Sequence, residues 1–131
     1  MVMYLIRGYT NYECTEGPEL EYGEFSELSE ALQKFIALSK DENALDFSFL
    51  DNEVDDWMSD PDWETDYYHG GYYGGRFYLY EHDEDNNWRE LLQAERMREP
   101  KDKSITLYGI EKLDDITEGE IALLSSLLGE R

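Results

Sequence analysis

Carboxylates at a regular spacing are the residues of this sequence with the clearest chemical potential. Residues 51–66 read DNEVDDWMSDPDWETD, in which eight of sixteen side chains are acids and none is basic. Most of these acids recur every second residue, and in an extended chain alternate residues share a face about 6.6 Å apart. Successive phosphates of one DNA strand rise about 3.4 Å along the axis, or roughly 6–7 Å along the helical path. Such a row can imitate a track of phosphates.

A second group of acids, Glu24, Glu27 and Glu30, recurs every third residue. If this segment is helical, Glu27 and Glu30 are neighbours about 5–6 Å apart at their Cβ atoms. Both groups lie in base-free runs, residues 8–33 with seven acids and residues 41–75 with eleven. The tryptophans among the acids would either anchor the segment to the core or contact a partner. The predicted partner-binding residues are Asp51, Glu53, Asp55, Asp56, Trp57, Asp60, Asp62, Trp63, Glu64, Asp66, Glu24, Glu27 and Glu30.

Solvated acidic loops and calcium loops are the competing interpretations of these segments. The alternate acids from Asp60 open like an EF-hand loop, which needs glycine at its sixth position and a bidentate glutamate at its twelfth. Those positions hold Thr65 and Gly71. A second such opening, from Asp83, fails at the same two positions. We therefore predict no dedicated metal site.

No pattern in the sequence predicts an enzyme. His69 and His82 are the only histidines and Cys14 is the only cysteine, and no spacing among them indicates a zinc site or an activated nucleophile. The glycines of HGGYYGGR lack the GK[ST] of a phosphate-binding loop. Acid pairs arise by chance in a chain this acidic, so they say little about acid–base catalysis. We expect a non-enzymatic protein without catalytic residues, metal or cofactor.

A tyrosine-rich stretch follows the acids. Residues 67–80 read YYHGGYYGGRFYLY and contain six tyrosines. Tyrosine offers a large, fairly rigid contact area with a polar tip and is enriched at interfaces. Two interpretations remain open: a hairpin whose tyrosines cover the sheet, or a contact surface beside the acidic one.

The composition predicts a folded domain with an unusually acidic surface. The chain has 131 residues, of which 40% are hydrophobic and 15% aromatic, whereas disordered acidic chains are poor in both. The net charge is −21, and residues 1–85 carry −18 of it. This field attracts cationic partners and disfavours direct binding to nucleic acid or an anionic membrane. A single cysteine, no signal peptide and no apolar span are consistent with a cytoplasmic protein.

The elements that would position these residues form one α+β domain over residues 1–131. Alternation and β-forming residues predict strands at residues 2–9, 44–50, 76–81 and 104–110, with a short strand near 20–22. Helical periodicity predicts helices from about 28 to 40, capped by Ser26, and from 88 to 98. A last helix follows the capping-box sequence at residues 117–120. We expect a mainly antiparallel or mixed sheet of about four strands with about three helices.

At class level the chain resembles the small acidic DNA-mimic inhibitors of phages and mobile elements, of the antirestriction and anti-CRISPR type. Its size, charge, base-free runs and acids interleaved with Trp and Tyr carry this resemblance. Residues 24–53, EFSELSEALQKFIALSKDENALDFSFLDNE, resemble the acidic helix-then-strand modules of conjugative-element antirestriction proteins. The resemblance implies an inhibitor of a basic nucleic-acid-binding nuclease in a bacterial cytoplasm. The alternative is an immunity protein or antitoxin that neutralises a basic toxin, because its charge logic is the same.

Overall fold

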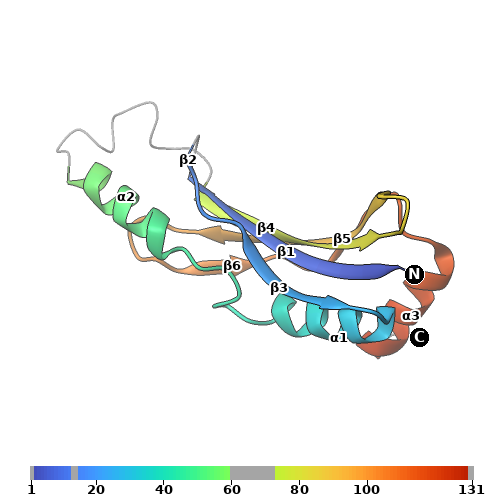
Figure 1. The fold of residues 1–131 in the computed structure, drawn as a ribbon. Coiled ribbons are helices and arrows are strands. Elements are labelled where there is room, and N and C mark those ends of the chain that lie inside the picture. The colour runs from blue at the N-terminus through green and yellow to red at the C-terminus, as the bar shows by residue number, and fades with distance from the viewer. Residues whose placement is uncertain (1, 13–14, 60–72, 130–131) are drawn as a thin grey trace.

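An antiparallel sheet with helices on one face forms the body of the molecule (Figure 1). The computed structural model describes residues 2–12, 15–59 and 73–129. In these residues the strand order is β2-β1-β4-β5-β6, while β3 also pairs with β1 and β7 with β5. The elements are β1 (Met3–Tyr12), β2 (Thr15–Glu16), β3 (Leu20–Phe25), α1 (Leu28–Ser39), α2 (Ser48–Met58), β4 (Tyr73–His82), β5 (Trp88–Arg98), β6 (Ile105–Leu107), β7 (Glu111–Lys112) and α3 (Glu118–Leu128).

The predicted α+β class is confirmed, but the sheet has seven strands in the described residues where about four were expected. The short β2 and β7 have two residues each, too few to show an alternating pattern in the sequence. The predicted first strand extends three residues further, to Tyr12, and the predicted short strand near residues 20–22 is the longer β3. The described residues contain three helices, the expected number, although α2 was not predicted and one predicted helix is a strand.

The core lies between the sheet and the helices, and α1, α2 and α3 all contribute buried residues to it. Helix α1 buries Ala31, Leu32, Phe35 and Leu38, which fall on one face at helical spacing. Phe35 packs edge-on against Phe77 of β4, with ring centroids 5.0 Å apart. The cap residue of α1 is Glu27 rather than the predicted Ser26, and its side chain makes no capping hydrogen bond.

Helix α3 begins as the sequence predicts. The Thr117 hydroxyl accepts a hydrogen bond from the Glu120 N–H at 3.2 Å, and the Glu120 carboxylate accepts one from the Thr117 N–H at 2.9 Å. This reciprocal capping box satisfies two backbone N–H groups at the start of the helix. The helix ends at Gly129, which takes the left-handed conformation with φ of 78°.

The strand predicted at residues 44–50 is wrong, because helix α2 begins at Ser48. Leu45 and Phe47 are buried as their alternation suggests, but Phe49 is 49% exposed on the helix. The Asp46 carboxylate accepts hydrogen bonds from the Ser48 N–H at 2.9 Å and the Ser48 hydroxyl at 2.7 Å. These local bonds compete with a strand ladder and favour a helix start. They also lower the pKa of Asp46 below its ordinary value.

The helix predicted at residues 88–98 is wrong as well, because these residues form β5. Leu, Gln, Ala, Glu, Arg and Met are all good helix formers, so the local preference is misleading here. Pairing with β4 over nine residue pairs, from Gly74↔Met97 to His82↔Trp88, overrides it. A register shift beside Tyr80 allows the consecutive Leu91 and Leu92 both to be buried, which hides the strand alternation.

Candidate functional site

The candidate site is the face of the sheet opposite the core, which we call the open face. Strand alternation divides the aromatic residues between the two faces. On β4, Tyr73 and Phe77 are buried toward the core, whereas Tyr78 and Tyr80 lie half-buried on the other side. On β1, Tyr9 lies opposite Arg76 of β4 and so shares the open face.

Aromatic rings form a continuous strip across the open face. The centroids of Tyr9 and Tyr78 are 6.4 Å apart, those of Tyr78 and Tyr80 are 5.7 Å apart, and those of Tyr80 and Trp88 are 5.9 Å apart. His82 stacks on Trp88 with centroids 4.1 Å apart. Trp88 remains 42% exposed. Large apolar rings that stay partly exposed in one continuous patch are a feature that the function of a surface often explains.

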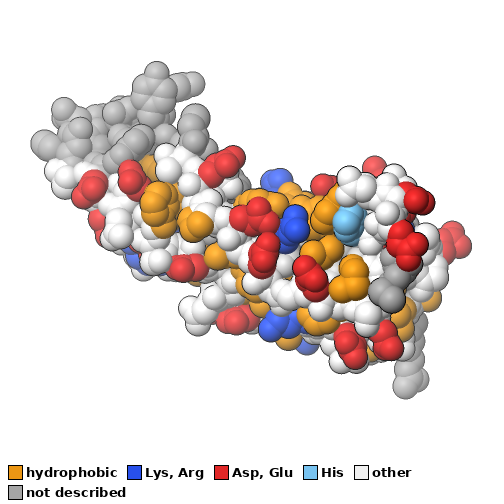
Figure 2. All heavy atoms as spheres, viewed as in Figure 1, with side chains coloured by type: hydrophobic (Ala, Val, Ile, Leu, Met, Phe, Trp, Pro, Cys, Tyr) orange, Lys and Arg blue, Asp and Glu red, His pale blue; other side chains and the backbone are white. Residues whose placement is uncertain are grey.

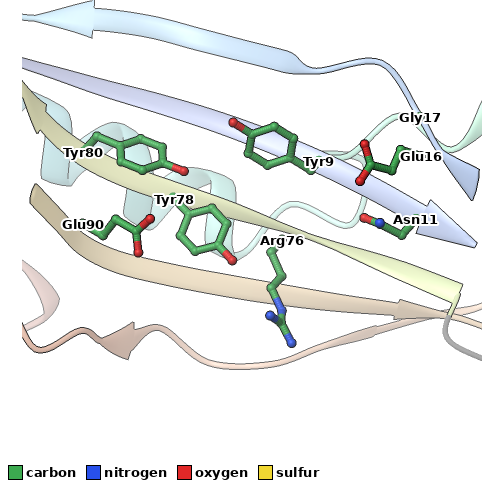
Figure 3. Close-up of a pocket in the computed structure, with 8 residues that line it drawn as sticks. All are labelled: Tyr9, Asn11, Glu16, Gly17, Arg76, Tyr78, Tyr80 and Glu90. Atoms are coloured by element: carbon green, nitrogen blue, oxygen red, sulfur yellow. The ribbon is translucent and has the colours of Figure 1, made fainter. Parts of the chain in front are cut away.

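A groove of about 560 Å³ runs along this strip between β1 and β4 (Figure 3). Its floor contains Tyr9, Tyr78 and Tyr80, and the Tyr9 and Tyr80 hydroxyls point toward one another. Glu16 and Asn11 lie toward one end, and Glu90 lies at the other, beside Tyr78 and Tyr80. The groove therefore has rings along its floor and a carboxylate at each end.

Further carboxylates border the open face along the edge strand β3. Glu21 lies opposite Arg7, and Glu24 lies opposite Leu5. Strand alternation alone would direct residues three apart to opposite faces, but a register shift intervenes and Gly23 adopts a φ of 126°. The bulge thus directs both glutamates to the side that carries the aromatic strip. Acidic side chains are spread widely over the visible surface, and few basic ones lie among them (Figure 2).

The arginines of the open face are already engaged by carboxylates. Arg76 Nε lies 2.9 Å from Glu95 Oε2, and Arg7 Nε lies 3.4 Å from Glu19 Oε1. Hydrogen bonds with Glu95 and Tyr78 raise the pKa of Arg76 above its ordinary value. Burial, with the neighbouring Tyr9 and Glu90, raises the pKa of Tyr80. At neutral pH Arg76 is therefore a cation held by Glu95, and Tyr80 is a neutral phenol.

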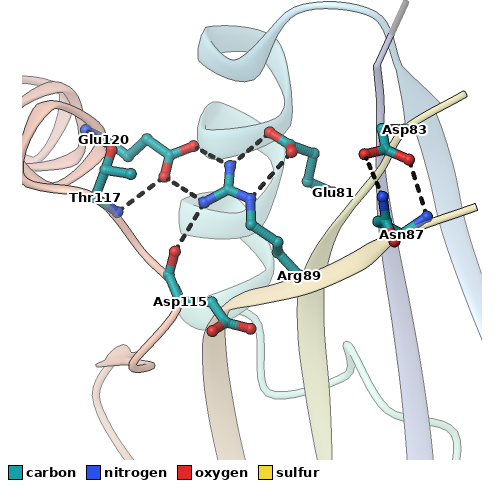
Figure 4. Close-up of polar contacts among 7 residues, drawn as sticks. All are labelled: Glu81, Asp83, Asn87, Arg89, Asp115, Thr117 and Glu120. Carbon is teal, nitrogen blue, oxygen red and sulfur yellow. Dashed lines mark hydrogen bonds and ion pairs between the residues drawn. The ribbon is translucent and has the colours of Figure 1, made fainter. Parts of the chain in front are cut away.

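On the core side, Arg89 is held between two carboxylates (Figure 4). Its Nη2 lies 2.6 Å from Glu81 Oε2 and 2.9 Å from Glu120 Oε2, and its Nη1 donates to the Asp115 carbonyl at 2.8 Å. Figure 4 also shows the turn after β4, where the Asp83 carboxylate accepts from the N–H and side-chain amide of Asn87. Arg96 is fully buried and donates to the Leu38 carbonyl at 2.6 Å.

The predicted acids on α2 divide into two kinds. Asp51 and Asp55 lie one helical turn apart and are ion-paired, Asp51 with Arg98 at 2.8 Å and Asp55 with Lys103 at 2.9 Å. Glu53 and Asp56 are exposed. The extended row expected for Asp51, Glu53 and Asp55 is therefore wrong, because a helix cannot place alternate residues on one face.

The other predicted site residues fall in three places. Glu24 is exposed on β3, Glu27 is the exposed cap residue of α1, and Glu30 is exposed in its first turn. Trp57 belongs to α2, but its side chain lies outside the described residues. The remaining ones, also outside the described residues, are Asp60, Asp62, Trp63, Glu64 and Asp66.

Sequence reasoning missed the groove because it assigned β5 as a helix. Tyr78 and Tyr80 lie in the tyrosine-rich stretch, whose described part forms the hairpin strand β4: Tyr73 is buried toward the core, and Tyr78 and Tyr80 lie half-buried on the open face. The interpretation of this stretch as a contact surface stays a prediction, and residues 67–72 lie outside the described residues. The alternation of Arg76, Tyr78 and Tyr80 could have predicted that these three side chains share one face of a strand. Glu16 and Glu90 had no such signal, since the long-range pairing of β1 with β4 brings their two hairpins together.

Comparison of the chain with protein-family models, curated proteins and solved structures found no match. Within residues 2–12, 15–59 and 73–129, no group of three or more His, Cys, Asp or Glu side chains is placed to hold a metal ion. None of the helices described is both long and apolar enough to cross a bilayer.

Proposed function

We propose that this protein is a non-enzymatic inhibitor that occupies the basic nucleic-acid-binding surface of a bacterial defence nuclease, a restriction or CRISPR effector, in the cytoplasm. One observation carries the proposal: the chain has 32 acids against 11 bases, and among the described bases five are ion-paired and Arg96 is buried. Arg7, Arg76, Arg89, Arg98 and Lys103 are bound to the chain's own carboxylates. The field that a partner meets is therefore negative.

Repulsion among the acids destabilises the folded state, so we infer that the excess negative charge serves the function. Long-range attraction accelerates the encounter with a basic protein and weakens as salt rises. The same field repels free nucleic acid. The field extends over several elements, because the acids Glu24, Glu27, Glu30, Glu53 and Asp56 are all exposed.

The decisive experiment is identification of the bound partner from a bacterial lysate, with the full chain as bait. We expect a basic nucleic-acid-binding protein to be captured, and DNA or RNA to compete with the bait for it. If the captured protein binds nucleic acid and this chain at the same time, nucleic-acid mimicry is wrong. Rescue of cells from a toxin, without protection of DNA from cleavage, would instead favour an immunity protein or antitoxin.

Charge reversal tests the contribution of the acids at matched total charge. The variant Glu53→Lys with Asp56→Lys is compared with the control Glu42→Lys with Asp114→Lys, since all four side chains are exposed. We expect Glu53→Lys with Asp56→Lys to weaken capture of the partner more than the control does. Both variants should reduce the salt dependence of capture equally, because they change the net charge by the same amount. Equal weakening by the two variants would place the contact away from α2.

A further inference from the structure

We propose that the groove of the open face binds an extended, arginine-containing segment of the partner. The guanidinium groups would stack on the Tyr78 and Tyr80 rings and approach Glu16 and Glu90 at the two ends. The inference rests on the proposed function in one respect, that the partner is a basic protein. It adds a contact on the sheet to the contribution that the proposed function expects from the acids of α2.

The length of the groove fits a short extended segment. Glu16 lies opposite Asn11 of β1, which lies opposite Gly74 of β4, while Glu90 lies opposite Tyr80. Along the strands, six residue steps on β4 separate the two carboxylates, about 20 Å, and across the sheet the three strand spacings from β2 to β5 add about 14 Å. An extended segment of seven residues that crosses the strands obliquely spans most of this distance, and the long arginine side chains at its ends cover the rest.

The chemistry of the groove favours a guanidinium over other ligands. A cation over the face of a tyrosine is attracted by the ring, and arginine makes this contact more often than lysine. The open face already shows the geometry, because the Arg7 guanidinium carbon lies 5.2 Å from the centroid of the Trp88 ring. Within the described residues neither Glu16 nor Glu90 has an ion-pair partner, so both can accept hydrogen bonds from a guanidinium.

A nucleic-acid strand, the other ligand that stacks on aromatic sheets, fits this groove poorly. Single-stranded nucleic acid requires a positively charged path for its backbone beside the rings. Here a carboxylate lies at each end, and Arg76 beside the tyrosines is ion-paired with Glu95. Charge complementarity therefore selects a cationic polypeptide as the occupant.

The test uses the full-length protein and a fluorescein-labelled peptide, Arg-Ser-Arg-Ser-Arg-Ser-Arg, followed by fluorescence anisotropy at low salt. Glu16→Gln with Glu90→Gln is compared with Glu42→Gln with Asp114→Asn, which removes the same charge from exposed positions outside the groove and outside the predicted partner-binding residues. We expect the groove variant to weaken binding at least tenfold and the control less than threefold. Equal losses would mean that the peptide senses only the overall field, which would overturn the proposal.

A second pair of variants separates the rings from their hydroxyls. Tyr78→Phe with Tyr80→Phe keeps the π faces, and Tyr78→Leu with Tyr80→Leu removes them while retaining apolar surface. We expect the Phe variant to bind the peptide within threefold of wild type and the Leu variant at least fivefold more weakly, with urea unfolding confirming that both are folded. Retained peptide binding by the Leu variant would overturn the stacking contact. The proposal would also be overturned if wild type and the Phe variant bound a labelled oligonucleotide and the Leu variant did not, because the rings would then serve nucleic acid.

The two proposals fail in distinguishable ways. If a nucleic-acid-binding partner is captured and competes with DNA, but Glu16→Gln with Glu90→Gln leaves its affinity unchanged, the groove inference is wrong and the proposed function stands. If the groove variants abolish capture while the captured protein still binds DNA in the complex, the groove inference stands and the inhibitory function is wrong.

Discussion

The two faces of the sheet carry the same kinds of side chain in different surroundings. On the covered face, Tyr12, Tyr73 and Phe77 are at most 1% exposed, and Tyr73 packs edge-on against Tyr12 and Phe47. On the open face, Tyr78 and Tyr80 contact one another but remain half-buried. Rings on the covered face have all their partners in the chain. Rings on the open face have part of their surface left for another molecule.

The arginines repeat this contrast. Arg89, on the core side, engages two carboxylates that are only 16% and 13% exposed. Arg76, on the open face, engages one, and its own side chain is 47% exposed. On the covered face the ion pairs of Arg89 therefore link β5 to β4 and to α3. On the open face the ion pair of Arg76 neutralises charge on a surface that stays solvated. Variants at matched positions of the two faces separate stability from binding.

The largest effect is expected from an aromatic residue of the covered face. Phe77→Ala removes a fully buried ring that contacts Phe35 and Tyr22, so unfolding should become easier by about 3–5 kcal/mol. The neighbouring Tyr78→Ala should cost about 1 kcal/mol or less, because its ring keeps water on one side. Urea unfolding of both variants measures the difference. Equal losses would show that the open face is part of the core.

The next effect comes from the arginines. Arg89→Ala leaves Glu81 and Glu120 without their cation in a poorly solvated place, so we expect a loss of about 2–3 kcal/mol, below that of a fully buried pair. Arg76→Ala removes an exposed pair and should cost under about 1 kcal/mol. Thermal unfolding at low and high salt checks both. A large loss for Arg76→Ala would contradict the contrast between the faces.

How far the sequence predicts this fold depends on whether a segment's own residues decide its structure. Strand β1, helix α1 and the capping box of α3 follow from local patterns that agree with their tertiary surroundings. Residues 88–98 do not, because helix-forming side chains are held in a strand by pairing with β4. Residues 48–58 fail for the opposite reason: their acids suggest an extended row, but Asp46 starts a helix.

The same limit applies to the candidate site. The acidity of the surface and the tyrosine-rich stretch are properties of the sequence alone. The ion pairs of Asp51 and Asp55 cannot be predicted from the sequence alone, because Arg98 and Lys103 lie more than forty residues away along the chain. Counting charges overestimates the acids available to a partner, since those nearest a base in space are neutralised first.

A smaller effect is expected where α2 is fastened to β5. The Asp51 carboxylate accepts from Arg98 Nε and Nη2 at 2.9 and 2.8 Å, and from the Tyr73 hydroxyl. Asp51→Ala leaves these donors without an acceptor and should cost about 1–2 kcal/mol. The exposed Glu53→Ala on the same helix should change stability by less than about 0.5 kcal/mol. Hydrogen exchange should show faster opening of α2 in Asp51→Ala alone; faster opening in both variants would contradict a specific anchor.

The smallest effect concerns pH and the Arg89 cluster. Burial alone would raise the pKa of Glu120, but hydrogen bonds from Arg89 and from Thr117 outweigh it and leave the pKa below its ordinary value. A carboxyl with a lowered folded-state pKa stabilises the fold above its unfolded pKa of about 4.3, and the contribution disappears as pH falls through the folded pKa. The stability advantage of wild type over Glu120→Gln, under about 1 kcal/mol, should therefore be constant from pH 7 to 5 and shrink between pH 4 and 3. Urea midpoints at these pH values measure it, with the exposed Glu118→Gln as the control for the dipole of α3. If the advantage persisted unchanged to pH 3, the stabilisation from the Arg89–Glu120 contact would not depend on the charge of Glu120.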